Sequence, residues 1–205
     1  MGKICAVISG GEYSGLNGIE KANYIIACDK GFEYALENGI KPDIFVGDFD
    51  SYKGTVPDGI PVLELPTQKD DTDTMAALRH AVAAGYGEIE IYCALGGRTD
   101  HTLANVQAAA FAVKSGAVVR IFGKETKMVV LSGGGITVPP EKDCSLSIFS
   151  LTDKCEGVTA SGVKYPLENA EINNTFPIGV SNEWEENAEI SVKSGILAVV
   201  ISKLI

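Results

Sequence analysis

The sequence has few basic residues and no long hydrophobic run, and both shortages limit the partners that it can have. Lysine and arginine number 17 against 27 aspartates and glutamates, which gives a formal net charge of −10. Binding to nucleic acid or to an anionic membrane depends on basic surface, so this composition argues against both partners. No apolar stretch approaches the roughly 20 residues that cross a bilayer, and the apolar run at 4–8 is too short for a signal peptide. We therefore expect a cytoplasmic protein with neither nucleic acid nor membrane as a partner.

Several diagnostic motifs are also missing. The five cysteines contain no Cys-x-x-Cys pair, which disfavours a disulfide framework and a zinc site and favours buried thiols. There is no P-loop, and the glycines at 10 and 11 do not complete G-x-G-x-x-G, so we interpret them as turn glycines. No serine has the G-x-S-x-G context of a nucleophile elbow. A P-loop kinase, a redox Rossmann protein and a serine hydrolase are accordingly disfavoured.

The first 124 residues alternate short apolar runs with helical patterns. This alternation predicts a Rossmann-like α/β domain with a mostly parallel sheet and helices on both faces. The glycine expected after a helix C-terminus follows each predicted helix. The predicted strands are 4–8, 24–27, 44–46, 62–65, 89–93 and 118–122, and the predicted helices are 32–38, 74–84 and 103–114.

After residue 125 the sequence pattern changes to short segments rich in Val, Ile, Ser and Thr, which are separated by glycines and prolines. Closely spaced strands with such turns predict a small antiparallel β-sandwich. We place the domain boundary near Lys124, which gives domains of 1–124 and 125–205.

Paired carboxylates follow two of the predicted strands in the first domain. Asp48 and Asp50 come after the strand at 44–46, and Asp71 and Asp73 open the helix that begins at 74. Ligands of open α/β sheets bind outside the carboxyl ends of the strands, and Mg²⁺ takes carboxylate, water and phosphate oxygens. Separate helix caps and turns are the ordinary alternative, but paired carboxylates in two loops favour one shared ion site.

Arg98 lies in Gly96-Gly97-Arg98-Thr99-Asp100, directly after another predicted strand. Its planar fork can clamp a phosphate while the glycines let backbone N–H groups approach the anion. Asp29 follows the strand at 24–27 and is a further candidate, with an N-cap as its alternative role. We interpret His101 as a surface or capping residue.

These motifs together resemble the thiamin pyrophosphokinase family, and the resemblance covers essentially the whole chain. It implies an α/β catalytic domain, a β-sandwich domain, and a homodimer with thiamin bound between subunits. It also implies transfer of pyrophosphate from ATP to thiamin with release of AMP. The segments that carry the resemblance are 27–31, 47–51, 68–73, 96–105, 162–165 and 180–183.

The resemblance also implies roles for residues. Asp48, Asp50, Asp71 and Asp73 would hold Mg²⁺ and the ATP phosphates, and Arg98 and Asp100 would complete the catalytic site. Gln68 and Asp73 would face thiamin. The pyrimidine ring of thiamin would be held by Tyr165, Ser181 and Asn182. Asp29 and Lys69 lie in the matching segments and are candidate ligands of the nucleotide.

Two other functions stay open at this point. The first is a Mg²⁺-dependent phosphohydrolase, which would use the same carboxylates. The second is a non-catalytic protein that binds thiamin or a nucleotide through the same residues. The acceptor of the hydroxyl proton, Asp71 or Asp100, is also open.

Overall fold

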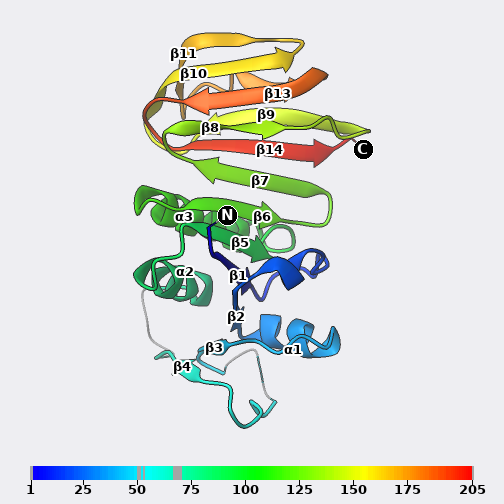
Figure 1. Cartoon of the computed structure of the whole chain (residues 1–205), viewed down its shortest axis with the longest axis vertical. Coiled ribbons are helices and arrows are strands. Elements are labelled where there is room, and N and C mark those ends of the chain that lie inside the picture. Colours follow the sequence, from blue (N-terminus) through cyan, green and yellow to red (C-terminus); the bar gives the residue numbers. More distant parts are fainter. Residues whose placement is uncertain (1, 50–51, 53, 67–70, 205) are drawn as a thin grey trace. The chain divides into compact units, whose positions relative to one another are not determined.

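The computed structural model describes residues 2–49, 52, 54–66 and 71–204. The chain forms two compact units, Met1–Lys124 and Glu125–Ile205 (Figure 1). The first unit is α/β and the second is built from strands.

A parallel sheet forms the centre of the first unit. Its strands lie in the order β4-β3-β2-β1-β5-β6, and each neighbouring pair is parallel. Residues 5–8 of the first strand are fully buried, as expected for a parallel sheet covered on both faces. This confirms the predicted fold class. The strands are β1 Ile4–Ile8, β2 Tyr24–Cys28, β3 Ile44–Gly47, β4 Val62–Glu64, β5 Glu88–Tyr92 and β6 Val118–Phe122.

Helices cover both faces of this sheet. α2 (Asp73–Ala83) and α3 (Thr99–Lys114) pack against each other on one face, and α1 (Lys30–Glu37) lies on the other (Figure 1). A short 3₁₀ helix, η1, spans Ile19–Lys21. On the α1 side, Phe32 packs on Phe45 and Tyr52 with ring centroids 5.3 and 5.2 Å apart. The aromatic cluster fixes α1 against the strands whose ends form the site described below.

The helices end within one residue of the predicted positions and α2 begins one residue early, but α1 and α3 begin two and four residues early. α1 starts at Lys30 instead of residue 32, and α3 starts at Thr99 instead of residue 103. The predicted starts were wrong because they followed the apolar periodicity alone. The polar end of the motif, Arg98 to Asp100, forms the N-cap and first turn of α3. An acidic side chain such as Asp100 interacts favourably with the helix dipole there. Arg98 therefore occupies the N-cap position of α3.

The second unit is a β-sandwich, as predicted. Its strands pair antiparallel in the orders β12-β9-β14-β7 and β11-β10-β13-β8. Side chains from both sets, among them Leu146, Val158, Ile190 and Leu197, form one buried cluster. The strands are β7 Thr126–Leu131, β8 Gly134–Val138, β9 Cys144–Ser150, β10 Lys154–Val163, β11 Leu167–Asn173, β12 Gly179–Asn182, β13 Trp184–Val192 and β14 Leu197–Lys203.

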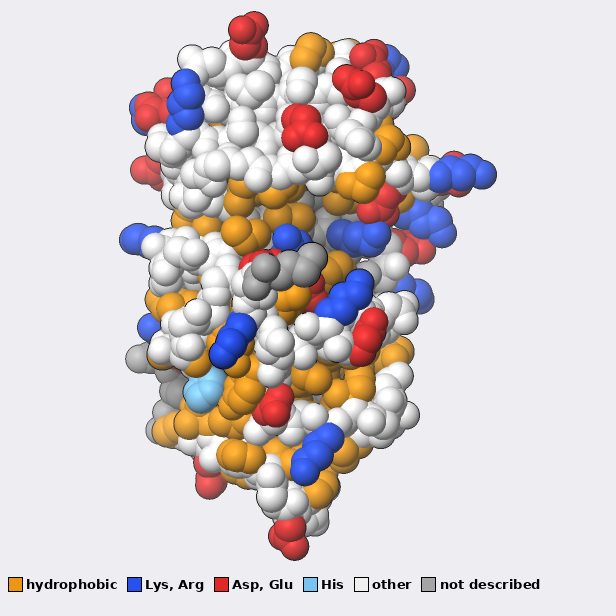
Figure 2. Space-filling view, viewed as in Figure 1, with side chains coloured by type: hydrophobic (Ala, Val, Ile, Leu, Met, Phe, Trp, Pro, Cys, Tyr) orange, Lys and Arg blue, Asp and Glu red, His pale blue; other side chains and the backbone are white. Residues whose placement is uncertain are grey.

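Two surface properties bear on the expected partners. In the part of the chain that the structure describes, no helix has both the length and the apolar character needed to cross a bilayer. On the face that Figure 2 shows, Lys and Arg side chains are interspersed with Asp and Glu side chains.

Candidate functional site

A cleft of about 650 Å³ lies in the first unit at the carboxyl ends of β1, β2, β3 and β5. The chain builds β1 to β4 on one side of the sheet and then β5 and β6 on the other, so the strand order reverses between β1 and β5. Open α/β sheets bind ligands at such a switch point. The side chains and glycines that line the cleft come from five separate segments of the chain. They are Ser9, Gly10, Gly11, Glu12, Tyr13, Cys28, Asp29, Lys30, Tyr34, Asp48, Thr72, Asp73, Ala94, Gly96, Gly97, Arg98, His101 and Asn105.

Three helix N-termini meet at this cleft. Asp29, Thr72 and Arg98 hold the N-cap positions of α1, α2 and α3, and all three line it. Only Thr72 makes a side-chain cap, since its Oγ1 accepts a hydrogen bond from the N–H of Met75 at 3.1 Å. The positive ends of the helix dipoles and their N–H groups suit an anion at this position.

The ordinary alternative for the aspartates, helix capping, is not observed at α1 or α2. The side chain of Asp29 makes no capping hydrogen bond, and at α2 the cap is Thr72, between Asp71 and Asp73. The two aspartates that flank Thr72 therefore do not cap α2.

Asp29 is held in an unusual conformation at the end of β2. It is 4% exposed, has φ of 39°, and donates its backbone N–H to Val46 O at 3.1 Å. Its carboxylate lies against Gly47, where a side chain would overlap it. The ends of β2 and β3 are thus joined through Asp29, and Asp48 follows directly.

The predicted carboxylates fall into two groups. Asp48 and Asp73 line the cleft. Asp71 instead contacts Arg79, with Oδ2 2.8 Å from Nε, and Asp100 contacts Arg98, with Oδ2 2.6 Å from Nη2. Of these four aspartates, two therefore line the cleft, beside Glu12 and Asp29, and the other two are paired with arginines.

The Arg98–Asp100 pair alters both pKa values. Hydrogen bonding from Arg98, together with the N–H of His101, holds the pKa of Asp100 below its usual range. The same contact raises the pKa of Arg98. Both side chains are largely exposed, at 71% and 65%, so solvent screens the attraction. The pair orients the guanidinium at the rim of the cleft more than it stabilises the fold.

The donor set suits Mg²⁺ in chemistry. Asp48 and Asp73 supply the one or two carboxylates that commonly bind this ion together with waters and substrate phosphates. Among the described residues, no three Asp, Glu, His or Cys side chains are grouped closely enough to hold a metal without such outside ligands. Three predicted site residues, Asp50, Gln68 and Lys69, lie outside the described residues.

Several residues of the cleft were not predicted from sequence. The hydroxyls of Ser9 and Thr74 lie 2.7 Å apart in the interior, and the amide of Asn105 donates to Ala94 O at 2.8 Å. Both contacts fix loops of the cleft to a neighbouring helix. Ser9 directly follows β1, and Asn105 is one helical turn after His101, which are the only sequence signals that point to them.

The side chains predicted to hold the pyrimidine lie together in the second unit. The N–H of Tyr165 donates to Oδ1 of Asn182 at 3.0 Å, and Nδ2 of Asn182 donates to Tyr165 O at 2.8 Å. Ser181, with φ of 58°, is anchored by its N–H to Ser147 Oγ at 3.0 Å. Tyr165 is 60% exposed, and the ammonium of Lys164 lies over its ring, 5.6 Å from the centroid.

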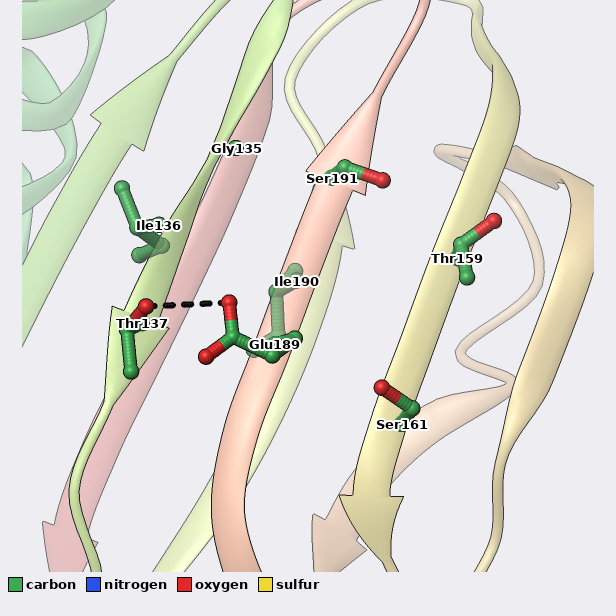
Figure 3. Close-up of a pocket in the computed structure, with 8 residues that line it drawn as sticks. All are labelled: Gly135, Ile136, Thr137, Thr159, Ser161, Glu189, Ile190 and Ser191. Carbon is green, nitrogen blue, oxygen red and sulfur yellow. Dashed lines mark hydrogen bonds between the residues drawn. The ribbon is translucent and has the colours of Figure 1, made fainter.

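A second, shallower groove of about 300 Å³ lies on β8, β13 and β10 (Figure 3). Hydroxyl side chains of Thr137, Thr159, Ser161 and Ser191 line it, and Thr137 donates to Glu189 at 2.9 Å. None of Tyr165, Ser181 and Asn182 lines this groove.

Comparison with known proteins gives a consistent result. The family profile "Thiamin pyrophosphokinase, catalytic domain" matches residues 17–121, and "Thiamin pyrophosphokinase, vitamin B1 binding domain" matches residues 135–197. The curated thiamine pyrophosphokinase of Bacillus subtilis is 29% identical over 184 residues, which cover 86% of each chain.

Solved structures agree with the profiles. The crystal structure of the Bacillus subtilis thiamine pyrophosphokinase has a TM-score of 0.84 at 26% identity and covers 98% of this chain and 99% of its own. That of the Geobacillus thermodenitrificans thiamin pyrophosphokinase has a TM-score of 0.80 at 26% identity, covering 98% and 97%. With both domain profiles matched in order along its length, this chain is an enzyme of the thiamin pyrophosphokinase family.

Proposed function

We propose that this enzyme transfers the pyrophosphoryl group of ATP to the hydroxyl of thiamin, with Mg²⁺, to give thiamin pyrophosphate and AMP. Family membership supports thiamin diphosphokinase activity. The observation that carries the details is the cleft itself, in which three helix N-termini and Arg98 face the same space as Asp48 and Asp73. We further propose that the unit up to Lys124 holds ATP and that the unit from Glu125 contributes the thiamin site.

The anion-binding elements of the cleft suit the phosphates of ATP. Gly10, Gly11, Gly96 and Gly97 line it, and glycines let backbone N–H groups approach a phosphate closely. Arg98 at the N-terminus of α3 offers a planar fork that binds phosphate oxygens in pairs. Lys30, in the first turn of α1, adds a second cation to the lining.

Asp48 and Asp73 would hold Mg²⁺ against those phosphates, together with Asp50 as predicted from sequence. When bound, the ion would offset negative charge on the phosphate oxygens. The two described carboxylates belong to the ends of β3 and the start of α2, so the sheet and one helix fix their separation.

The pyrimidine of thiamin would stack on Tyr165 and receive hydrogen bonds from Ser181 and Asn182. The paired hydrogen bonds between Tyr165 and Asn182 hold the aromatic residue in place through its backbone. With Lys164 over one face of the ring, a flat ligand would stack on the other face.

The chemistry requires little from the protein beyond position and charge. The thiamin hydroxyl attacks the β-phosphorus in line with the departing AMP oxygen, and catalysis of such transfers comes mainly from alignment and electrostatic stabilisation. Asp100 orients Arg98, and its lowered pKa makes it a weak base. Of the two candidates that the sequence offers for the hydroxyl proton, this leaves Asp71.

The test is AMP release from Mg-ATP by the purified enzyme, with and without thiamin, with products separated by chromatography. Thiamin-dependent AMP with an equal amount of thiamin pyrophosphate is the expected result. Asp73→Asn should lower turnover by roughly 100-fold with an unchanged unfolding temperature. Asp58→Asn, at an exposed carboxylate that does not line the cleft, is the control and should behave as wild type.

The other outcomes separate the competing functions. AMP or phosphate released at the same rate without thiamin would identify a phosphohydrolase. Binding of both ligands without any product would identify a non-catalytic binding protein. Wild-type turnover in Asp73→Asn would contradict the assigned ion site.

The homodimer and the cytoplasmic location stay predictions. Light scattering should give about twice the chain mass of 21.6 kDa. If thiamin binds between subunits, mixing inactive Asp73→Asn with inactive Asn182→Ala should restore activity, because one site of the mixed dimer is intact. Each variant alone would serve as the control.

A further inference from the structure

Arg79 forms a two-point ion pair with Asp71, the residue before the N-cap of α2. It lies on α2, eight residues after Asp71, and reaches back to that carboxylate. Nε donates to Oδ2 at 2.8 Å and Nη2 approaches Oδ1 at 3.4 Å. Both oxygens of Asp71 are therefore engaged by one guanidinium, the arrangement that fixes the direction of a carboxylate most strictly.

A second contact fixes the guanidinium itself. Its central carbon lies over the ring of Phe111 on α3, 4.7 Å from the centroid. α2 and α3 pack against each other, so this ring is part of the helix pair and not a loop. A long side chain loses conformational entropy when it is held in one rotamer. Because the guanidinium already stacks on a fixed aromatic ring, less of this entropy is lost when Arg79 pairs with Asp71.

The local charge explains why such a support is useful. Asp71 and Asp73 flank Thr72 on one short turn, and like charges this close disfavour each other. Arg79 offsets the charge of Asp71, and neither residue lines the cleft, whereas Asp73 does.

We propose that Arg79 is a positioning residue that holds Asp71 in one orientation at the start of α2, with Phe111 on α3 fixing the plane of the guanidinium. The proposal rests on the proposed function, because Asp71 is one of its predicted catalytic carboxylates. Arg79 acts through Asp71 and need not touch either substrate.

Four variants test this. Arg79→Leu removes the pair, Arg79→Lys keeps the charge but not the fork or the stacking, and Phe111→Leu keeps apolar bulk but not the ring. Arg120→Leu is the matched control, since Arg120 pairs with Glu88 at 3.1 Å on the sheet and lies outside the cleft lining.

We expect Arg79→Leu to lower kcat by roughly 10- to 100-fold, the range typical of residues that orient an active group. The KM for thiamin should stay within twofold of wild type. Arg79→Lys and Phe111→Leu should fall between wild type and Arg79→Leu, and Arg120→Leu should match wild type. In an Asp71→Asn background, Arg79→Leu should cause no further loss, because the group through which it acts is already changed.

A readout independent of turnover separates failure of this proposal from failure of the proposed function. In ¹H–¹⁵N spectra the Nε–H of Arg79 should give a resolved signal in wild type that is lost in Asp71→Asn and weakened in Phe111→Leu. A wild type without thiamin-dependent turnover but with this signal would overturn only the proposed function. Absence of the signal in wild type, full kcat in Arg79→Leu, or an equal loss in the Asp71→Asn background would overturn the positioning role.

Discussion

Gly47→Ala tests whether the contact between the ends of β2 and β3 shapes the cleft. Gly47 is buried beside Asp29, and its φ is outside the left-handed range, so the backbone itself accepts alanine. The added carbon would lie 2.7 Å from Cγ of Asp29 and 3.1 Å from Cζ of Phe45. Carbon atoms in favourable contact are about 3.5–4.0 Å apart, so the Asp29 carboxyl must retreat by about 1 Å.

The expected losses follow from that displacement. Overpacking of this kind costs about 1–3 kcal/mol of stability, which for a chain of this size lowers the unfolding temperature by about 2–12 °C. A shift of about 1 Å at an active site can lower kcat/KM by roughly 100-fold. Because Asp48 follows Gly47 directly, both carboxylates would move.

The assay is kcat/KM for ATP in the thiamin-dependent reaction, paired with thermal unfolding. Gly87→Ala is the control, since a carbon added there meets nothing within 4 Å and the change should leave both quantities unchanged or stabilise slightly. In an Asp29→Ala background the stability loss from Gly47→Ala should shrink, because the overlapping carboxylate is gone. Wild-type kcat/KM in Gly47→Ala, or an undiminished stability loss in that background, would refute the reasoning.

Three further predictions address the cap, the ion pair and the acceptor. Thr72→Ala removes the only side-chain cap observed at the three helix N-termini of the cleft. It should lower the free energy of unfolding, measured by calorimetry, by about 0.5–2 kcal/mol, and Thr72→Ser should retain most of that stability. Arg98 lowers the pKa of Asp100, so the stability from this pair is present above the ordinary aspartate pKa and is lost as the pH falls through the lowered value. Arg98→Gln should therefore move the titration of Asp100, followed by carboxyl NMR, to higher pH, and an unchanged midpoint would contradict the pairing. Ser181→Ala should raise the KM for thiamin more than it lowers kcat, whereas the reverse pattern in steady-state kinetics would place Ser181 outside the acceptor pocket.

Much of the fold could be predicted from the sequence because its signals are local. Apolar runs such as 4–8 and 118–122 match β1 and β6 at both ends. Each helix of the first unit is followed by a glycine with positive φ, at 39, 85 and 116, as the helix stop signals predict. The helix starts were less accurate because the polar residues of the first turns carry no apolar periodicity.

The contacts inside the site could not be predicted, because they join residues far apart in the sequence. The Ser9–Thr74 hydrogen bond spans 65 positions, and the ring of Phe111 meets Arg79 only because α2 and α3 pack together. Asp48, Asp71, Asp73 and Asp100 looked alike in sequence. Their separation into cleft-lining and arginine-paired residues depends on side-chain direction, which residue spacing alone does not determine.

That separation suits an enzyme whose two proposed substrates carry opposite charge. ATP is an anion and the thiazolium of thiamin is a cation, so a uniformly acidic cleft would repel the first and a basic one the second. Arginines in the same unit offset the charge of Asp71 and Asp100, while Asp48 and Asp73 remain at the cleft among three helix N-termini. Of these four aspartates, only Asp48 and Asp73 then add negative charge to the cleft lining, beside the carboxylates of Glu12 and Asp29, while Lys30, Arg98 and the glycines of the lining can accept phosphate. Removing either arginine should therefore weaken ATP binding more than thiamin binding, and an equal effect on both substrates would contradict this division of charge.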